Sequence, residues 1–299
     1  MIGPGTVIGP YAVIEGETTI GARNRIFQFA SIGADPQDLK YHGEPSRLEI
    51  GDDNKIREFT TIHRGTEGGG MLTRIGNDVL VMNYAHIAHD CFIGDHSIIA
   101  NSTELAGHCV LEEYVVTAGM CGVHQFTRVG AHAFVAAGSK IAQDVPPYSM
   151  VAGDRARLVG VNTTGLERRG FGAGTITALK HAFRTLFYGK LLREDAIRQV
   201  LAEDGEVPEV RRLIDEAYQS AHSILEANQD AMHRIAAALL ERETIDAEEV
   251  RLLIEGKELP PIRSILASPT DQGGSVQQVL KPEGTRGGPS FPEGSPSPA

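Results

Sequence analysis

The sequence is poor in aromatic residues and in cysteine. It has no tryptophan and only three cysteines in 299 residues, and aromatic residues make up 6% of the chain. No Cys-x-x-Cys pair occurs, so no two cysteines have the spacing of the common redox and zinc motifs.

Basic charge and long apolar runs are also scarce. The chain has 28 Lys and Arg residues against 39 Asp and Glu residues, and its net charge of −11 argues against nucleic acid or an anionic membrane surface as the main partner. No apolar run reaches the roughly 20 residues of a membrane-spanning helix. The first residues lack the basic and apolar regions of a signal peptide. We therefore expect a cytoplasmic protein with no nucleic-acid partner and no membrane insertion.

What the sequence does contain is a branched aliphatic residue at every sixth position. The most regular series, interrupted only by Thr117, is Ile75, Val81, Ile87, Ile93, Ile99, Leu105, Leu111, Val123, Val129, Val135 and Ile141. The same period runs through Ile2 to Ile32 and through Ile50, Ile56 and Ile62. Fixed self-similarity indicates a solenoid, in which each repeat buries its apolar residue by stacking on its neighbours.

The six-residue period predicts an all-β solenoid, a left-handed parallel β-helix of hexapeptide repeats. Three hexads make one triangular coil, so eighteen residues advance the chain by one strand spacing of about 4.8 Å. The 34 glycines suit corners where a positive φ is needed. Cys91, Cys109 and Cys121 each follow a hexad position by four residues. This slot faces inward, so we expect all three thiols to pack in the core.

The eighteen-residue rule brings a group of polar residues together. His89 lies one coil below Gly107, and Asp90 lies one coil below His108. An imidazole beside an accessible backbone N–H supplies a general base and an oxyanion donor, the two groups that acyl transfer requires. Outward polar residues of a solenoid are usually only solvated, but here five histidines form one cluster: His63, His86, His89, His108 and His124.

Several motifs resemble one family along residues 2 to 190. They are Ile62-His63-Arg64-Gly65-Thr66, Asn83 to Asp90, Leu105-Ala106-Gly107-His108, Gln37 to Lys40, Val123 to Phe126, Ala142 to Tyr148 and Gly160-Val161-Asn162. In order and spacing they resemble the acyl-ACP:UDP-N-acetylglucosamine O-acyltransferases of lipid A biosynthesis.

The resemblance implies transfer of a 3-hydroxyacyl chain from acyl carrier protein to the 3-hydroxyl of UDP-N-acetylglucosamine by a homotrimer, with no metal and no cofactor. It implies that His89 is the base, assisted by Asp90 and by the backbone N–H of Gly107. The implied substrate-binding residues are Gln37, Asp38, Lys40, His63, His86, His108, His124, Gln125, Asn162, Arg168 and Arg169.

Three positions depart from the family pattern. Thr164 stands where glutamate often follows the asparagine by two residues, and Gly153-Asp154-Arg155 replaces a common Gly-Asn-His. Ala137 stands at the acyl-chain ruler position, where a long-chain relative has glycine. Its extra methyl group predicts a slightly shorter acyl chain.

We expect three regions: the β-helix acyltransferase domain over residues 1–157, an α-helical domain over 158–267 and a disordered tail over 268–299. Residues 34–49 should form a loop that replaces one coil, and residues 66–74 a flexible loop. The solenoid should end near Pro146 and Pro147, because proline cannot donate to a β-ladder. Helices are expected at about 175–190, 193–204, 208–241 and 246–255, the last with a capping box of Asp246 and Glu249.

Residues 209–261 resemble instead the C-terminal helices of membrane-anchored AAA zinc proteases. The motifs are Ile214 to Tyr218, Ala236 to Ile245 and Glu255 to Pro261. The protease's His-Glu-x-x-His motif and its phosphate loop are absent. We expect an appended helical module without activity of its own.

Three alternatives stay open at this point. The first is a related hexapeptide-repeat acyltransferase with another acceptor, such as the 3-amino sugar. The second is a trimeric enzyme that binds zinc through three of its histidines. The third alternative is a catalytically silent trimeric scaffold.

Overall fold

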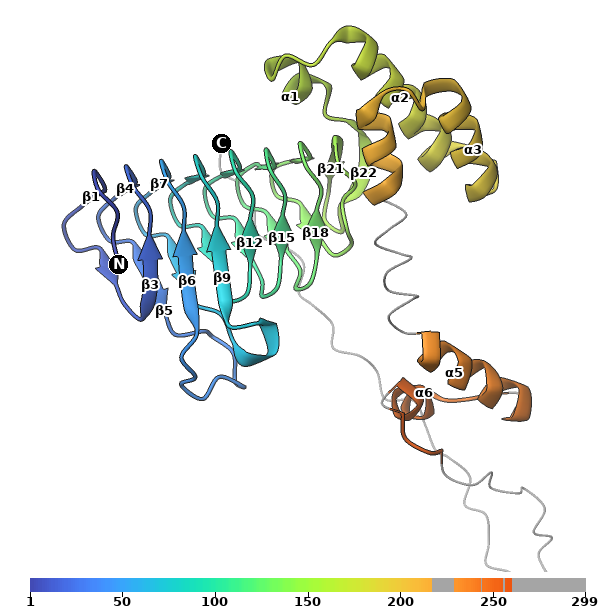
Figure 1. Ribbon diagram of the computed structural model, residues 1–299, viewed down its shortest axis with the longest axis horizontal. Coiled ribbons are helices and arrows are strands. Elements are labelled where there is room, and N and C mark those ends of the chain that lie inside the picture. The colour runs from blue at the N-terminus through green and yellow to red at the C-terminus, as the bar shows by residue number, and fades with distance from the viewer. Residues whose placement is uncertain (217–228, 243, 255, 260–299) are drawn as a thin grey trace, which may run out of the picture. The chain divides into compact units, whose positions relative to one another are not determined.

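The computed structural model describes residues 1–216, 229–242, 244–254 and 256–259. These residues belong to two compact units, Met1–Gln229 and Asp230–Ala299. The first unit is a left-handed parallel β-helix followed by helices, as predicted. In Figure 1 its coils stack along one axis from β1 to the strands β21 and β22.

Three sheets form the three faces of the β-helix. The nine-stranded sheet contains, in order, β1 (Val7–Ile8), β4 (Arg25–Ile26), β7 (Lys55–Ile56), β10 (Leu80–Val81), β13 (Ile98–Ile99), β16 (Val116–Thr117), β19 (Phe134–Val135), β21 (Ser149–Ala152) and β22 (Arg157–Val161). The seven-stranded sheet contains β2 (Val13–Ile14), β5 (Ser31–Ala34), β8 (Thr61–His63), β11 (His86–Ile87), β14 (Glu104–Leu105), β17 (Gly122–Val123) and β20 (Lys140–Ile141). The six-stranded sheet contains β3 (Glu17–Ile20), β6 (Arg47–Ile50), β9 (Leu72–Ile75), β12 (Phe92–Ile93), β15 (Val110–Leu111) and β18 (Arg128–Val129).

The register confirms the eighteen-residue rule in the regular coils. Ile87 pairs with Leu105, and Leu105 pairs with Val123, each eighteen residues further along the chain. The predicted aliphatic positions from Ile20 to Ile141 fill one continuous core, in which Ile87 and Leu105 are fully buried. In the first coil Ile2 and Ile8 are 47% and 41% exposed, so the burial that the repeat predicted for them was wrong. The three cysteines are free and buried in this core, as predicted.

The corners correct the expectation for glycine. The left-handed corner residues of successive coils are non-glycine residues such as Tyr84, Asp90 and His108, with φ of 60°, 58° and 62°. Gly107, one residue before His108, is needed for a different reason, since the neighbouring coil leaves no room for its β-carbon. Backbone approach, more than a positive φ, therefore explains glycine in the regular coils.

The two loops are insertions between hexads. Ile20 pairs with Ile50, thirty residues on, so the first loop adds residues to a complete coil. The prediction that it replaces one coil was wrong, because Ile32 and Ile50 lie on different faces of the helix. The second loop contains the short 3-10 helix η1 (Glu67–Gly69) and ends where β9 begins.

The solenoid ends near Pro146 and Pro147, as predicted, but the expectation that these prolines end it was wrong. Both prolines lie in the turn before β21, where no ladder donor is needed, and Met150 of β21 pairs in parallel with Phe134. The sheet ends one strand later, because β22 returns antiparallel to β21.

Helices follow β22 in the first unit. They are α1 (Thr163–Arg168), α2 (Ala173–Tyr188), α3 (Arg193–Asp204) and a helix over residues 208–216. The predicted helix over 193–204 is confirmed, and the one over 175–190 lies at α2. Leu166, Leu179, Val200 and Leu213 form a second core together with Tyr148 from the end of the solenoid.

The second unit contains α6 (Ala247–Ile254) and all of α5 (Gln229–Arg242) except its first residue. The predicted capping box is present, because Oδ1 of Asp246 accepts the Glu249 N–H at 2.8 Å and Oε2 of Glu249 accepts the Asp246 N–H at 3.0 Å. Residues 217–228, in the middle of the predicted helix over 208–241, and the tail of residues 268–299 lie outside the described residues. The boundaries of residues 1–157, 158–267 and 268–299 stay predictions. Among the helices that the structure describes, none has the length and apolar character needed to cross a membrane.

Candidate active site

The predicted base and its acidic neighbour form a hydrogen-bonded pair at one corner of the coil. His89 and Asp90 lie between β11 and β12, and Nδ1 of His89 is 2.8 Å from Oδ2 of Asp90. The Asp90 side chain is 1% exposed and the His89 side chain 13% exposed. With Nδ1 held by the carboxylate, Nε2 is the ring nitrogen left to accept a proton. This arrangement suits a general base.

Gly107 lies one coil along from His89, against its ring. A β-carbon at residue 107 would lie 2.5 Å from Cε1 and 2.7 Å from Nε2 of His89. Any residue other than glycine would therefore clash with the imidazole ring in its present position. The Gly107 N–H donates no hydrogen bond to any residue in the part of the chain that the structure describes. It therefore remains available to an oxyanion.

Three more histidines lie near this pair. The ring centroids of His89 and His108 are 5.1 Å apart, and those of His63 and His86 are 4.8 Å apart. Burial lowers the pKa of His63 to about 4, helped by the neighbouring His86 and His89. Burial also lowers the pKa of His86 and that of His108. At neutral pH these three rings are uncharged and suit hydrogen bonding to a polar substrate.

The hydrogen bonds of the cluster leave some ring nitrogens open. Nδ1 of His86 is 2.7 Å from Oγ1 of Thr61. Nδ1 of His63 is buried and has no partner among the described residues. His124 and Gln125 are exposed one coil beyond Gly107, with Nδ1 of His124 3.1 Å from the Gln125 carbonyl oxygen.

The loop of residues 35–46 contains the predicted ligands Gln37, Asp38 and Lys40. Arg64 holds this loop, because its guanidinium donates to Oη of Tyr41 at 2.8 Å and pairs with Asp35. The charges of Asp38 and Lys40 both reach His108, where Asp38 raises and Lys40 lowers its pKa. The loop therefore lies beside the histidine cluster.

Away from the histidine cluster, Arg168 and Arg169 line a cavity of about 640 Å³. Its floor is the outer face of the nine-stranded sheet, with Ile98, Val116, Phe134 and Met150, and its wall is residues 161–169. The guanidinium of Arg169 lies 4.1 Å from the ring centroid of Tyr114. A cation stacked on an aromatic ring beside an apolar floor suits a ligand with a flat ring and negative charge.

Asn162 has a structural role at this cavity. Its Oδ1 accepts the Gly165 N–H at 3.1 Å at the start of α1, and its Nδ2 donates to the His132 carbonyl oxygen at 2.9 Å. Both ends of the side-chain amide are therefore engaged. Asn162 is thus the N-cap of α1, the helix that presents Arg168 and Arg169. The direct substrate contact expected from the sequence stays a prediction.

The structure does not bring all the predicted residues to one place within a single chain. His89 lies at the corner between the seven- and six-stranded sheets, whereas Tyr114 and Arg169 lie at the corner between the six- and nine-stranded sheets. Ala137, the predicted ruler residue, is exposed at the third corner, between β19 and β20. These are three different edges of the triangular coil.

Comparison with known proteins decides the family. A relative from Myxococcus xanthus named acyl-[acyl-carrier-protein]–UDP-N-acetylglucosamine O-acyltransferase is 53% identical over 209 residues, covering 70% of this chain and 81% of the relative. The chain belongs to the UDP-N-acetylglucosamine O-acyltransferase family. A relative of the same name from Xanthomonas oryzae pv. oryzae is 52% identical over 211 residues, covering 70% of this chain and 80% of the relative.

Solved structures and family models agree with this assignment to the acyltransferase family. LpxA from Acinetobacter baumannii has a TM-score of 0.70 at 43% identity, over 73% of this chain and 85% of that one. UDP-N-acetylglucosamine acyltransferase from Campylobacter jejuni has a TM-score of 0.67 at 38% identity, over 71% and 82%. A bacterial transferase hexapeptide model of six repeats matches residues 72–107, and the model of domain 2 of UDP-N-acetylglucosamine O-acyltransferase matches residues 144–225.

The match to domain 2 corrects the reading of the C-terminal region. The acyltransferase model matches the sequence as far as residue 225, so the resemblance of residues 209–225 to AAA zinc protease helices was wrong. Amphipathic helices share composition across unrelated families, which explains the error. The resemblance of residues 226–261 to the proteases is not confirmed.

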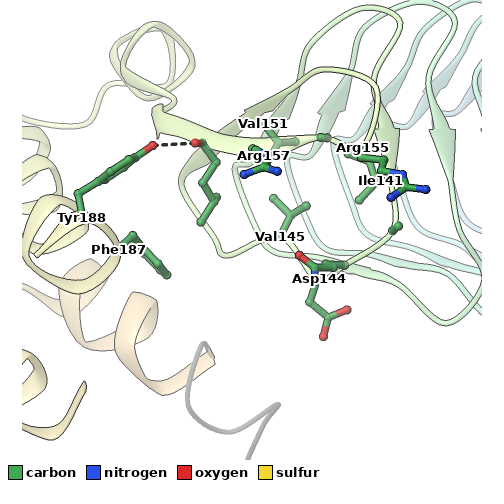
Figure 2. A pocket seen from close by; sticks show the side chains of 12 residues that line it. Ile141, Asp144, Val145, Val151, Arg155, Arg157, Phe187 and Tyr188 are labelled. Carbon is green, nitrogen blue, oxygen red and sulfur yellow. Dashed lines mark hydrogen bonds between the residues drawn. The ribbon is translucent and has the colours of Figure 1, made fainter. Parts of the chain in front are cut away.

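Another cavity of this acyltransferase, of about 850 Å³, lies where the solenoid ends against α2. Figure 2 shows Arg155 and Arg157 on the β-helix side of the cavity and Phe187 and Tyr188 on the helical side. Oη of Tyr188 donates to the Leu158 carbonyl oxygen at 2.7 Å across it. Neither arginine forms an ion pair within the described parts of the chain.

One group of side chains has the spacing of a metal site. It consists of His89, Asp90 and His108, each with one potential ligand atom, all within 4.8 Å of one another. However, Oδ2 of Asp90 is already engaged by His89 at 2.8 Å and by Oγ1 of Thr66 at 2.6 Å. These hydrogen bonds favour a base with its carboxylate partner over a set of metal ligands. The expectation that no metal takes part stays a prediction.

Sequence reasoning missed Thr66, Tyr114 and His132. Tyr114 and His132 carry the eighteen-residue spacing and stack with ring centroids 4.7 Å apart, so the repeat could have placed them together. Thr66 lies in a loop that interrupts the hexads, and no periodic signal connects it with Asp90.

Proposed function

We propose that this chain transfers a 3-hydroxyacyl group from acyl carrier protein to the 3-hydroxyl of UDP-N-acetylglucosamine, the first step of lipid A biosynthesis. The observation that carries this proposal is the His89–Asp90 pair held against the backbone of Gly107. The names of the relatives support O-transfer to UDP-N-acetylglucosamine over transfer to an amino sugar.

The reaction begins at Nε2 of His89. This nitrogen takes the proton of the sugar hydroxyl as the hydroxyl oxygen attacks the carbonyl carbon of the thioester. The tetrahedral intermediate then collapses, the carbon–sulfur bond breaks, and the carrier leaves as a thiol that receives the proton from His89. Asp90 stabilises the imidazolium between these two steps through its bond to Nδ1.

The backbone N–H of Gly107 would donate to the oxyanion of the intermediate. Removing one such donor in well-studied enzymes costs about 3–4 kcal/mol of transition-state stabilisation. No side chain supplies this group, so the close backbone approach at Gly107 is what makes it possible. The thioester itself supplies the activated acyl group, and the proposed reaction uses no cofactor.

The cavity beside Arg168 and Arg169 is our candidate for the nucleotide. Its apolar floor and the Arg169–Tyr114 stack suit a pyrimidine ring, and the two guanidinium groups suit a diphosphate. Burial lowers the pKa of Arg169, so a bound anion would relieve the cost of its partial desolvation. Thr164, on the same wall, leaves this chain without the glutamate that the family often has there.

We infer a homotrimer in which each active site is shared between two copies. The nine-stranded sheet has apolar residues on its outer face, namely Leu80, Ile98, Val116, Phe134 and Met150. At its edge four exposed rings stack from coil to coil: Tyr11, Phe29, Phe59 and Tyr84, with centroids 5.6, 5.2 and 4.9 Å apart. An extended apolar surface of this kind supports burial against another copy of the chain.

Sharing of the site can be tested with mixed trimers. His89→Ala and Arg169→Ala should each abolish or strongly reduce transfer. Coexpression of the two variants should restore part of the activity, because some interfaces then combine an intact His89 with an intact Arg169. Trimers that contain only one variant provide the control, and absence of restored activity in mixed trimers of confirmed mass would contradict a shared site.

The charge distribution supports docking of an acidic carrier protein near the end of the solenoid. The chain is acidic, with a net charge of −11, yet residues 155–193 contain a single acidic residue, Glu167. The basic residues of this segment are Arg155, Arg157, Arg168, Arg169, Lys180, Arg184, Lys190 and Arg193. Arg155→Glu with Arg157→Glu should raise the KM for acyl carrier protein and leave the KM for UDP-N-acetylglucosamine unchanged.

Acyl-chain length is set, in this proposal, at Ala137. A methyl group there shortens the slot that glycine would leave, so Ala137→Gly should shift the preferred donor to a longer chain. Mass spectrometry of products formed from a mixture of 3-hydroxyacyl donors measures the shift. The idea fails if wild type already prefers the longest donor.

The cytoplasmic location expected from the sequence stays a prediction.

The reaction itself is tested by transfer from mass-tagged 3-hydroxyacyl carrier protein to UDP-N-acetylglucosamine. Wild type should form the 3-O-acyl product, and His89→Ala should lose about two to four orders of magnitude in rate while remaining assembled. His42→Ala is the matched control, because His42 is an exposed histidine of the neighbouring loop. Wild type that binds both substrates but transfers nothing would support the silent scaffold instead.

A further inference from the structure

Thr66 binds the carboxylate of Asp90 with both its backbone and its side chain. The Thr66 N–H donates to Oδ1 of Asp90 at 2.9 Å and lies 3.1 Å from Oδ2, and the Thr66 hydroxyl donates to Oδ2 at 2.6 Å. Thr66 itself is 4% exposed. The same Oδ2 is 2.8 Å from Nδ1 of His89, so the hydroxyl of Thr66 and the proposed base share one oxygen atom.

The hydroxyl of Thr66 binds Asp90 in place of the N-cap bond that a threonine at this position usually forms. Thr66 is the N-cap residue of η1, a position where a threonine hydroxyl ordinarily accepts an N–H of the first turn. Here no such side-chain bond forms, and the hydroxyl points to a residue 24 positions away. The local stabilisation of the turn is thus replaced by a contact with Asp90.

The glycines on either side of Thr66 bring the loop onto the carboxylate. A β-carbon at Gly69 would lie 2.0 Å from Cγ of Asp90, and one at Gly65 would lie 2.8 Å from its Oδ1. The loop backbone therefore covers the carboxylate, which explains why the Asp90 side chain is only 1% exposed. A further bond, from the Asp90 N–H to Oγ1 of Thr73 at 2.8 Å, fixes the backbone of Asp90.

We propose that Thr66, with the glycine turn that follows it, is a positioning residue for the His89–Asp90 pair. Thr66 sets the direction of the Asp90 carboxylate and shares its charge, and through Asp90 it sets the ring orientation and basicity of His89. This inference rests on the proposed function, because it assigns a purpose to the loop only if His89 is the base.

The titratable groups around His89 are few, and a change at Thr66 acts on one of them. They are Asp90 on the same turn, His63 and His86 from β8 and β11, and His108 on the next coil. His108 is in turn faced by Asp38 and Lys40. Loss of the Thr66 hydroxyl leaves more of the carboxylate charge for the His89 imidazolium, which favours its protonated form. The acidic limb of the pH profile of kcat/KM should therefore move to higher pH.

The test compares Thr66→Val, which keeps the shape and removes the hydroxyl, with Thr66→Ser, which keeps the hydroxyl. Thr66→Val should lower kcat about tenfold to a hundredfold with the KM for UDP-N-acetylglucosamine unchanged, and move the acidic limb upward. Thr66→Ser should stay within about threefold of wild type and keep the limb in place. Thr103→Val is the matched control, because Thr103 is a fully buried threonine whose hydroxyl donates to the Ala118 carbonyl oxygen, away from the site.

Equal losses in Thr66→Val, Thr66→Ser and Thr103→Val, with no movement of the limb, would overturn the inference. An NMR titration of the His89 ring, assigned with His89→Gln, separates this failure from that of the proposed function. If wild type transfers no acyl group but the His89 titration midpoint still rises in Thr66→Val and not in Thr66→Ser, the positioning contact stands and the assigned reaction falls. An unchanged midpoint in both variants overturns the positioning contact itself.

Discussion

The imidazole of His89 fills the space that a side chain at residue 107 would occupy. The nearest ring atom, Cε1, lies 2.5 Å from the position of an added β-carbon, which is shorter than any van der Waals contact. The proposed base and the proposed oxyanion donor therefore lie directly against each other on neighbouring coils.

Gly107→Ala should therefore inactivate the protein without unfolding it. The methyl group must push the His89 ring away from its bond with Asp90, and we expect the transfer rate to fall about a hundredfold. Gly174→Ala is the control, because Gly174 lies in α2, away from the histidine cluster, and its β-carbon would meet no atom within 4 Å. Rates for the two variants, with circular dichroism to show that each is folded, decide the point. Equal rates would contradict the contact.

Stability should depend on pH through His63. Burial lowers its pKa to about 4, whereas an unfolded histidine titrates near 6.5. Between these values the unfolded chain binds a proton that the folded protein does not, so the free energy of unfolding rises with pH over this window. The contribution amounts to about 2 kcal/mol between pH 5 and pH 7. His63→Gln should remove this part of the pH dependence in urea unfolding measured at both pH values. His42→Gln should retain it, and an equal dependence in His63→Gln would refute the role of His63.

Arg212 should hold the helical segment onto the solenoid. Its guanidinium lies 3.1 Å from Oε2 of Glu112 and 2.6 Å from Oε1 of Glu113, and it also pairs with Glu216. The Glu112 side chain is 6% exposed, so loss of a partner is costly, although Arg128 still pairs with it. We expect Arg212→Met to lower the free energy of unfolding by about 1–2 kcal/mol, less than for a fully buried pair because Arg212 is 35% exposed. Arg198→Met, which breaks the exposed pair with Asp195, should change it by less than about 0.5 kcal/mol in the same urea titration.

Asn162 should act on nucleotide binding through the cap of α1. Asn162→Asp keeps the oxygen that accepts the Gly165 N–H, whereas Asn162→Ala removes it. We expect the alanine variant to lose about 1 kcal/mol of stability and to bind UDP-N-acetylglucosamine more weakly, because Arg168 and Arg169 lose their support. The aspartate variant should keep the cap, but it loses the donor to the His132 carbonyl oxygen and places a negative charge beside the proposed diphosphate site, so it should recover part of the stability and none of the binding. Calorimetric titration with the nucleotide sugar measures the binding, and an alanine variant that binds as tightly as wild type would contradict the role of the cap.

The regular part of the fold could be predicted because one rule repeats. Each aliphatic side chain of the hexad series, such as Ile87 or Leu105, points inward for the same reason as the one before it. The eighteen-residue offset then places His89 against Gly107 and Asp90 beside His108 without further information. This much of the candidate site follows from sequence spacing alone.

The rest depends on contacts that have no period. The loop that contains Thr66 leaves the coil and returns to it, so no offset relates Thr66 to Asp90. Arg212 meets Glu112 one hundred positions away in the sequence, through a helical segment whose placement follows from packing. Asn162 had the expected position, but its bonds to Gly165 and to His132 are set by how the chain leaves the last coil.

The register across the two loops determines where this protein tolerates changes in length. Ile50 still pairs with Ile20 and with Ile75 although both intervals exceed one coil, so the ladder stays in phase on either side of each excursion. A deletion of one residue within a coil would instead rotate every later aliphatic side chain toward solvent. Insertions and deletions should therefore be tolerated best at the loop tips, the same segments that face the histidine cluster. Changes in substrate preference can therefore accumulate there while the folding of the solenoid is left alone.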